Sequence, residues 1–155
     1  MNANGQDWVL HCAALRNIAE NSGLEGLDAL ARYTSEELAC IYNGIGADWM
    51  PDKMCRKLTD WLSLFEPAAL IHDMRNYMSD GSRYGFNFAN MEFQPNCLKL
   101  ADAAYPWYSW RRYRARAAAH IAYDFVSGPG GWKAWMDAAA KRKACNTTQT
   151  TKEES

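Results

Sequence analysis

Hydrophobic residues along the chain recur at spacings of three and four, a pattern that predicts amphipathic helices. Thr34 and Glu37 match a capping box, and Pro67 and the glycines around Pro129 mark breaks between helices. The predicted helices cover residues 9–20, 24–31, 35–41, 51–65, 68–78, 87–103, 106–126 and 132–143. No alternating run is long enough to predict a strand. The fold class is therefore mainly α, a compact domain of antiparallel helices with one glycine-rich loop at residues 42–47.

The length of 155 residues fits a single domain with its own core. We expect residues 1–143 to form this helical domain, and residues 144–155, which lack apolar anchors, to form a disordered polar tail. No stretch approaches the roughly 18 apolar residues of a membrane span, and residues 1–8 lack the pattern of a secretory signal. We therefore expect no transmembrane segment and a cytoplasmic location.

Cysteine usage and charge add two expectations. The five cysteines, an odd number at irregular spacing without a C-x-x-C pair, predict reduced thiols and no structural disulfide: Cys12, Cys40, Cys55, Cys97 and Cys145. The net charge is only −1, but residues 111–143 carry eight basic and two acidic side chains, whereas residues 1–40 carry six acidic and two basic. The C-terminal part is therefore suited to an anionic partner, such as a lipid head group, a nucleic acid or another protein.

Two stretches suggest chemistry. His72 and Asp73 follow the apolar run of residues 68–71, and burying an imidazole or a carboxylate costs free energy unless it has a partner. The glycines of residues 42–46 allow the carbonyls of alternate residues to converge, and with Asp73 they would form an oxygen cage that suits calcium better than magnesium. The alternatives are a core histidine bonded to a backbone carbonyl and an ordinary glycine turn.

The order of these motifs resembles that of the phospholipase A2 superfamily. The stretches that carry the resemblance are Tyr42-Asn43-Gly44-Ile45-Gly46, His72-Asp73 with Tyr77, Ala89-Asn90-Met91-Glu92-Phe93, and the basic helix from Arg111 that leads to Gly130-Gly131-Trp132. The chain is most similar to the disulfide-free bacterial and phage-encoded members. The resemblance covers about residues 41–135 and adds a virion-associated location as an alternative.

The resemblance implies a calcium-dependent hydrolase of phospholipid acyl esters. His72 would be the general base, the carbonyls of Tyr42, Gly44 and Gly46 and the carboxylate of Asp73 would hold Ca²⁺, and the Gly44 amide would help to stabilise the oxyanion. Asn90 would hold the second nitrogen of His72, opposite it on an antiparallel helix. Tyr77 would take the place of the tyrosine that supports the site in the family.

Two departures from the family pattern bear on activity. Asn90 stands where the family has an aspartate, so the imidazolium would lack a supporting charge, and we expect hydrolysis to be weak or absent. The family's tyrosine falls four residues after the histidine, where this chain has Asn76. Tyr77 is one residue further on, which turns its side chain by about 100° on a regular helix.

Two other functions remain open from the sequence. The first is an inactive structural or interaction module on the same helices. The second is nucleic-acid binding through the mixed aromatic and arginine residues 107–116. Helical spacing of Trp107, Trp110 and Arg114 favours a half-buried helix for this segment, ahead of contact with a phospholipid surface and of nucleic-acid binding.

Overall fold

The computed structural model describes residues 3–42 and 52–153, and the side chains of residues 5–42 and 61–143. This part of the chain forms seven helices and no strand, which confirms the mainly α prediction. The helices are α1 (Ala3–Asn21), α2 (Asp28–Ala31), α3 (Ser35–Ile41), α4 (Asp52–Tyr77), α5 (Arg83–Ala104), α6 (Trp110–Val126) and α7 (Pro129–Glu153).

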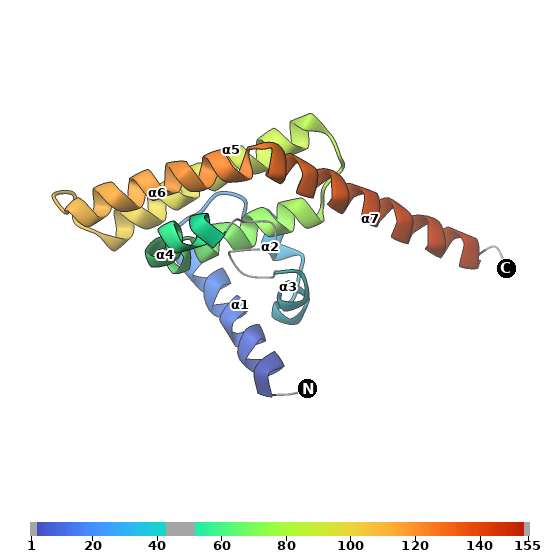
Figure 1. Ribbon diagram of the computed structural model, residues 1–155. Coiled ribbons are helices and arrows are strands. Elements are labelled where there is room, and N and C mark those ends of the chain that lie inside the picture. Colours follow the sequence, from blue (N-terminus) through green and yellow to red (C-terminus); the bar gives the residue numbers. More distant parts are fainter. Residues whose placement is uncertain (1–2, 43–51, 154–155) are drawn as a thin grey trace.

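Three long helices form the body of the molecule. α4, α5 and α6 follow one another in alternating directions, with α5 packed against both neighbours (Figure 1). α1, α2 and α3 lie against α4 on the side away from α6, whereas α7 begins against α4 and α6 and its later turns leave the body (Figure 1). The antiparallel arrangement predicted for the helices therefore holds for α4 to α6.

Side-chain caps begin three of the helices. The predicted capping box is present, because the Glu37 amide donates to Thr34 Oγ1 at 3.3 Å and the Thr34 amide donates to Glu37 Oε2 at 2.7 Å. Ser82 accepts from the Gly85 amide at 2.9 Å and begins α5 four residues earlier than predicted. Ser109 accepts from the Arg111 amide at 3.2 Å, so α6 begins at Trp110 and not at Pro106.

The predicted break at Pro67 is wrong, because α4 runs through this proline. A proline inside a helix costs about 3 kcal/mol. Here both halves of α4 pack into one core, with Phe65 before the proline and Leu70, Ile71 and Met74 after it nearly or fully buried. Burial of each such side chain contributes about 1.5–3 kcal/mol, so the packing outweighs the proline.

The C-terminal helix also differs from its predicted bounds. α7 begins at Pro129, which suits the first turn of a helix, and continues to Glu153, beyond the predicted end near Lys143. The last turns of α7 lie away from the other helices (Figure 1). Helices without tertiary packing are marginal in water. Disorder of residues 144–155 in solution stays a prediction.

The described cysteines are free: Cys12 and Cys97 lie in the core and Cys40 is exposed. Burial raises the pKa of the Cys12 thiol, with the Glu66 carboxylate adding to the shift, so this group stays protonated. We expect a thiol assay in denaturant without reductant to recover all five thiols. Recovery of three or one would show that disulfides form.

Gly26 is the glycine whose replacement should damage the fold next to His72. Its φ is +85°, and a Cβ atom would lie 2.7 Å from Ile71 Cγ2 and 2.8 Å from Glu92 Oε2. Gly26→Ala should therefore lower the free energy of unfolding by about 2–4 kcal/mol, from left-handed backbone strain and overpacking together. Gly23, with φ +58° and open space around its Cβ position, is the control, and Gly23→Ala should cost about 1 kcal/mol in urea unfolding. Equal losses would contradict the packing argument.

Candidate active site

His72 faces α5 from the buried side of α4. Its Nε2 atom lies 3.1 Å from Oδ1 of Asn90, and the exposed fractions of the two residues are 7% and 2%. The apolar residues of α4 on either side of His72 hold this face against α5, and the Phe93 ring packs 5.1 Å from the imidazole. The structure thus confirms the predicted contact between residues 72 and 90.

The amide groups around His72 define its tautomer. Because the oxygen of Asn90 faces Nε2, Nε2 carries the proton and donates it. The Nδ1 atom then accepts, and it lies 3.4 Å from Nδ2 of Asn76, four residues further along α4. His72 is therefore a neutral imidazole with an amide beside each ring nitrogen.

Two atoms of these amides have no partner within the residues that the structure describes. They are Oδ1 of Asn76 and Nδ2 of Asn90, and both are buried. Buried polar groups in proteins are nearly always hydrogen-bonded to protein or water. An acceptor and a donor are therefore available beside the imidazole for water or for a polar group of a ligand.

Burial shifts the pKa values of His72 and Asp73 in opposite directions. It lowers the pKa of His72 to about 4, against a smaller upward effect of the hydrogen bond with Asn90. It raises the pKa of Asp73 to about 7. In both residues the low-dielectric surroundings disfavour the charged form.

These two pKa shifts change the free energy of unfolding in opposite directions as the pH rises. His72, with its pKa depressed from 6.5 to about 4, contributes stability above pH 6.5 that is lost as the pH falls toward 4. Asp73, with its pKa raised from 3.8 to about 7, contributes stability below pH 3.8 that is lost as the pH rises through 7. Between about pH 4 and 6.5 the two effects cancel.

Asp73→Asn should expose the effect of His72 alone. Relative to the parent protein, the free energy of unfolding of the variant should rise by about 1.4 kcal/mol per pH unit between pH 4 and 6.5. Urea unfolding in the presence of a chelator measures this difference. Parallel profiles of the two proteins would contradict the assigned pKa shifts.

The predicted calcium ligands fall into two groups. Asp73 is partly buried, and Tyr42 is buried beside Trp8, whose ring stacks on it at 5.7 Å. Gly44 and Gly46 lie outside the described residues, which therefore contain only Tyr42 and Asp73 of the predicted ligands. Within the described part, no three His, Cys, Asp or Glu side chains lie close enough to hold a metal.

Asp73 has the chemistry that calcium requires. Its side chain is partly buried, which raises the pKa of the carboxyl to about 7, and no hydrogen bond or ion pair to it occurs among residues 5–42 and 61–143. A divalent cation would offset the cost of burying its negative charge, because opposite charge favours the ionised form. Asp73 therefore fits the role of the one carboxylate in a site completed by backbone carbonyls.

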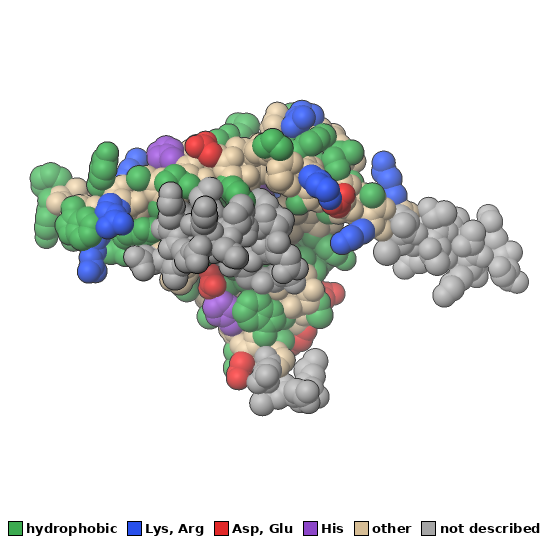
Figure 2. Space-filling model, viewed as in Figure 1, with side chains coloured by type: hydrophobic (Ala, Val, Ile, Leu, Met, Phe, Trp, Pro, Cys, Tyr) green, Lys and Arg blue, Asp and Glu red, His purple; other side chains and the backbone are tan. Residues whose placement is uncertain are grey.

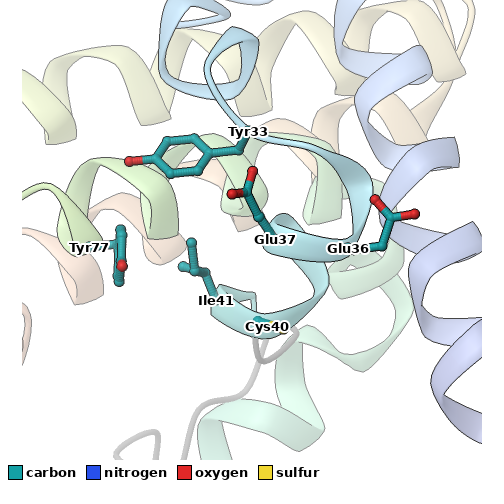
Figure 3. Close-up of a pocket in the computed structure, with 6 residues that line it drawn as sticks. All are labelled: Tyr33, Glu36, Glu37, Cys40, Ile41 and Tyr77. Atoms are coloured by element: carbon teal, nitrogen blue, oxygen red, sulfur yellow. The ribbon is translucent and has the colours of Figure 1, made fainter. Parts of the chain in front are cut away.

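Tyr77 lies away from His72. It is half exposed, its ring contacts Tyr33 edge-on at 6.3 Å, and it lines an open pocket of about 280 Å³ beside α3 (Figure 3). None of the described contacts joins Tyr77 to His72. Asn76 instead takes the position one helical turn beyond the histidine, as the rotation of about 100° per residue requires.

The sequence did not reveal an ion-pair network beside the site. Arg75 donates two hydrogen bonds of 2.8 Å to Glu92 and two of 2.8 and 3.0 Å to Asp28, and so joins α4, α5 and α2. Arg75 lies one turn beyond His72, and Glu92 lies two residues beyond Asn90. On antiparallel helices a residue three positions after His72 lies opposite a residue before Asn90, so the pairing of 72 with 90 did not signal this network, which the tertiary fold alone brings together.

Comparison of the chain with models of protein families, with curated proteins and with solved structures gives no match. None of the described helices is both long enough and apolar enough to cross a membrane.

Proposed function

We propose that the chain is a calcium-dependent hydrolase of phospholipid acyl esters with a phospholipase A2-like helical fold and weak activity. The observation that carries this proposal is the buried hydrogen bond between His72 and Asn90, on antiparallel helices, with the carboxyl of Asp73, whose pKa burial raises to about 7, next in sequence. The order of motifs in the sequence predicted this contact between two residues that are 18 positions apart.

The protonation state of His72 fits a general base. Nε2–H donates to Asn90, which holds the ring in one orientation and leaves the lone pair on Nδ1. Nδ1 can accept a proton from a water molecule that attacks an ester carbonyl, once Asn76 yields its position beside this nitrogen. Calcium bound by Asp73 and the carbonyls of Tyr42, Gly44 and Gly46 would polarise the ester carbonyl and, with the Gly44 amide, stabilise the oxyanion.

The same site explains why activity should be weak. An imidazolium formed at His72 would be buried beside an amide without charge, and the low pKa of about 4 expresses this cost. In serine proteases, an asparagine in place of the supporting aspartate lowers the rate about 10⁴-fold. Asn90 therefore holds the imidazole of His72 in the orientation of a general base but supplies no negative charge to stabilise the imidazolium.

A second function is favoured by the amides at both ring nitrogens. Asn76 and Asn90 occupy the positions beside Nδ1 and Nε2, an arrangement that also suits a stable buried histidine. The chain would then be an inactive structural or interaction module on the same helices. Nucleic-acid binding through residues 107–116 stays a prediction from the sequence.

Hydrolysis of phospholipid vesicles separates these functions. The parent protein and His72→Ala are compared in millimolar calcium and in excess chelator. We expect slow release of fatty acid that requires both His72 and calcium. Release that persists in chelator and in His72→Ala would end the phospholipase proposal, whereas no release above background would support the inactive module.

A further inference from the structure

The turn between α5 and α6, together with the first turn of α6, carries four exposed aromatic side chains. The exposed fractions are 82% for Trp107, 74% for Tyr108, 63% for Trp110 and 78% for Tyr113. The prediction that Trp107, Trp110 and Arg114 lie on the buried face of a half-buried helix is therefore wrong. The helix buries its alanines against α5 instead, and its aromatic face turns outward.

We propose that this turn binds the interface of a phospholipid bilayer that contains anionic lipids. We name it the aromatic tip and define it as Trp107, Tyr108, Trp110, Arg111, Tyr113 and Arg114. It lies at the end of the α5–α6 hairpin, far from the turn that joins α4 to α5 (Figure 1). Figure 2 shows hydrophobic and basic side chains together at this end of the molecule.

The chemistry of the aromatic tip matches the bilayer interface. Trp and Tyr have an apolar ring and a polar group, and they concentrate where lipid tails meet head groups. Exposing four such rings to water within seven residues adds nothing to the core, because none of the four is buried in it. Their transfer to the interface would remove apolar area from water.

Charge at the aromatic tip favours anionic lipids. Arg112 and Arg116 are both bonded to Asp102, at distances of 2.6–2.8 Å, and hold α5 to α6. Arg111 and Arg114 are exposed, and no carboxylate pairs with either among the described residues. Arg114 lies 5.3 Å from the Trp110 ring. These two arginines are available to lipid phosphates, which attract basic residues near the membrane surface.

The shape of the aromatic tip favours a bilayer over a single-stranded nucleic acid. Proteins that bind single strands combine stacking with a positively charged groove that follows the backbone. Here the rings lie at the end of the α5–α6 hairpin. Two contacts hold this end in place: the hydrogen bond of Arg112 with Asp102, and the edge-on contact of Tyr105 with Trp61 at 5.8 Å. A rigid projecting end can enter an interface with little ordering cost.

Binding to vesicles of non-hydrolysable ether phospholipids tests the inference in the presence of chelator. The vesicles contain phosphatidylcholine with about one-third phosphatidylserine, a content chosen to give a negative surface potential. The double variant Trp107→Ser/Trp110→Ser should bind at least about tenfold more weakly. The control Tyr84→Ser/Met91→Ser removes exposed apolar side chains from α5 and should bind within about twofold of the parent protein. Arg111→Gln/Arg114→Gln should lose about fivefold per arginine, and only on the anionic vesicles.

Three results would overturn the inference: no binding by the parent protein, equal losses in the tip and control variants, or salt-sensitive binding to a single-stranded oligonucleotide without binding to vesicles. Because the lipids cannot be hydrolysed and calcium is chelated, the result is independent of the proposed hydrolase activity. Vesicle binding without hydrolysis of ester lipids would support the aromatic tip and reject the proposed activity.

Discussion

Asn90→Asp is expected to raise calcium-dependent ester hydrolysis at least about tenfold, with an upper limit near the 10⁴-fold effect of the reverse change in a serine protease. The aspartate would accept the same hydrogen bond from Nε2 of His72, which now spans 3.1 Å, and would add a negative charge beside it. That charge stabilises the imidazolium that forms as the base takes a proton, so the pKa of His72 should rise from its value of about 4. Rates on vesicles and an NMR titration of His72 measure the two effects.

The control for this gain is the same change in a His72→Ala background, where no increase is expected because the charge has no base to support. An unchanged rate in Asn90→Asp, together with a raised pKa of His72, would show that proton transfer to His72 does not limit the reaction. An unchanged pKa would contradict the assigned contact itself.

Arg75→Ala is expected to lower the free energy of unfolding by about 3–5 kcal/mol, because it leaves Glu92 buried without its partner. The side chains of Arg75 and Glu92 are only 15% and 11% exposed, and Glu92 accepts two hydrogen bonds from the guanidinium. The third member of the network, Asp28, is 70% exposed and adds little by itself. Denaturant unfolding measures the loss.

Two variants control for this loss. Lys133→Ala removes an exposed pair with Asp137 on α7 and should cost no more than about 0.5 kcal/mol. Arg75→Met/Glu92→Met removes both buried charges and should recover most of the stability lost in Arg75→Ala. Failure of the double variant to recover would mean that Arg75 acts through its packing on Phe88, 5.3 Å from the guanidinium, and not through its charge.

The sequence predicted the helices better than their ends. Thr34 and Glu37 identified one helix start correctly because a capping box is a local interaction. The helix break predicted at Pro67 was wrong because burial of Phe65, Leu70 and Ile71 stabilises the continuous helix by more than the proline destabilises it. This burial depends on the tertiary fold and is not visible in the local sequence. The caps at Ser82 and Ser109 were not predicted. The sequence placed the start of α5 too late, at Asn87, and the start of α6 too early, at Pro106.

The site was predictable where it follows from helix geometry. His72 and Asn90 meet because two antiparallel helices bring them opposite each other, and the motif supplied both positions. The contact of Asn76 with Nδ1 follows from the four-residue helical repeat, although Tyr77 was expected to support the histidine. The links of Asn96 to the backbone of Glu25, at 2.7 and 2.9 Å, join positions 71 residues apart, and no local pattern signals such a pair.

Thermal unfolding with and without calcium tests the proposed site most directly, because it requires no turnover. If Asp73 is a calcium ligand, a hundredfold excess of calcium over its dissociation constant should stabilise the protein by about 2.7 kcal/mol, or roughly 5–10 °C in Tm for a chain of this length. Magnesium should do less, and Asp73→Asn should abolish the shift. A Tm that does not respond to calcium, or that responds equally in Asp73→Asn, would contradict the account.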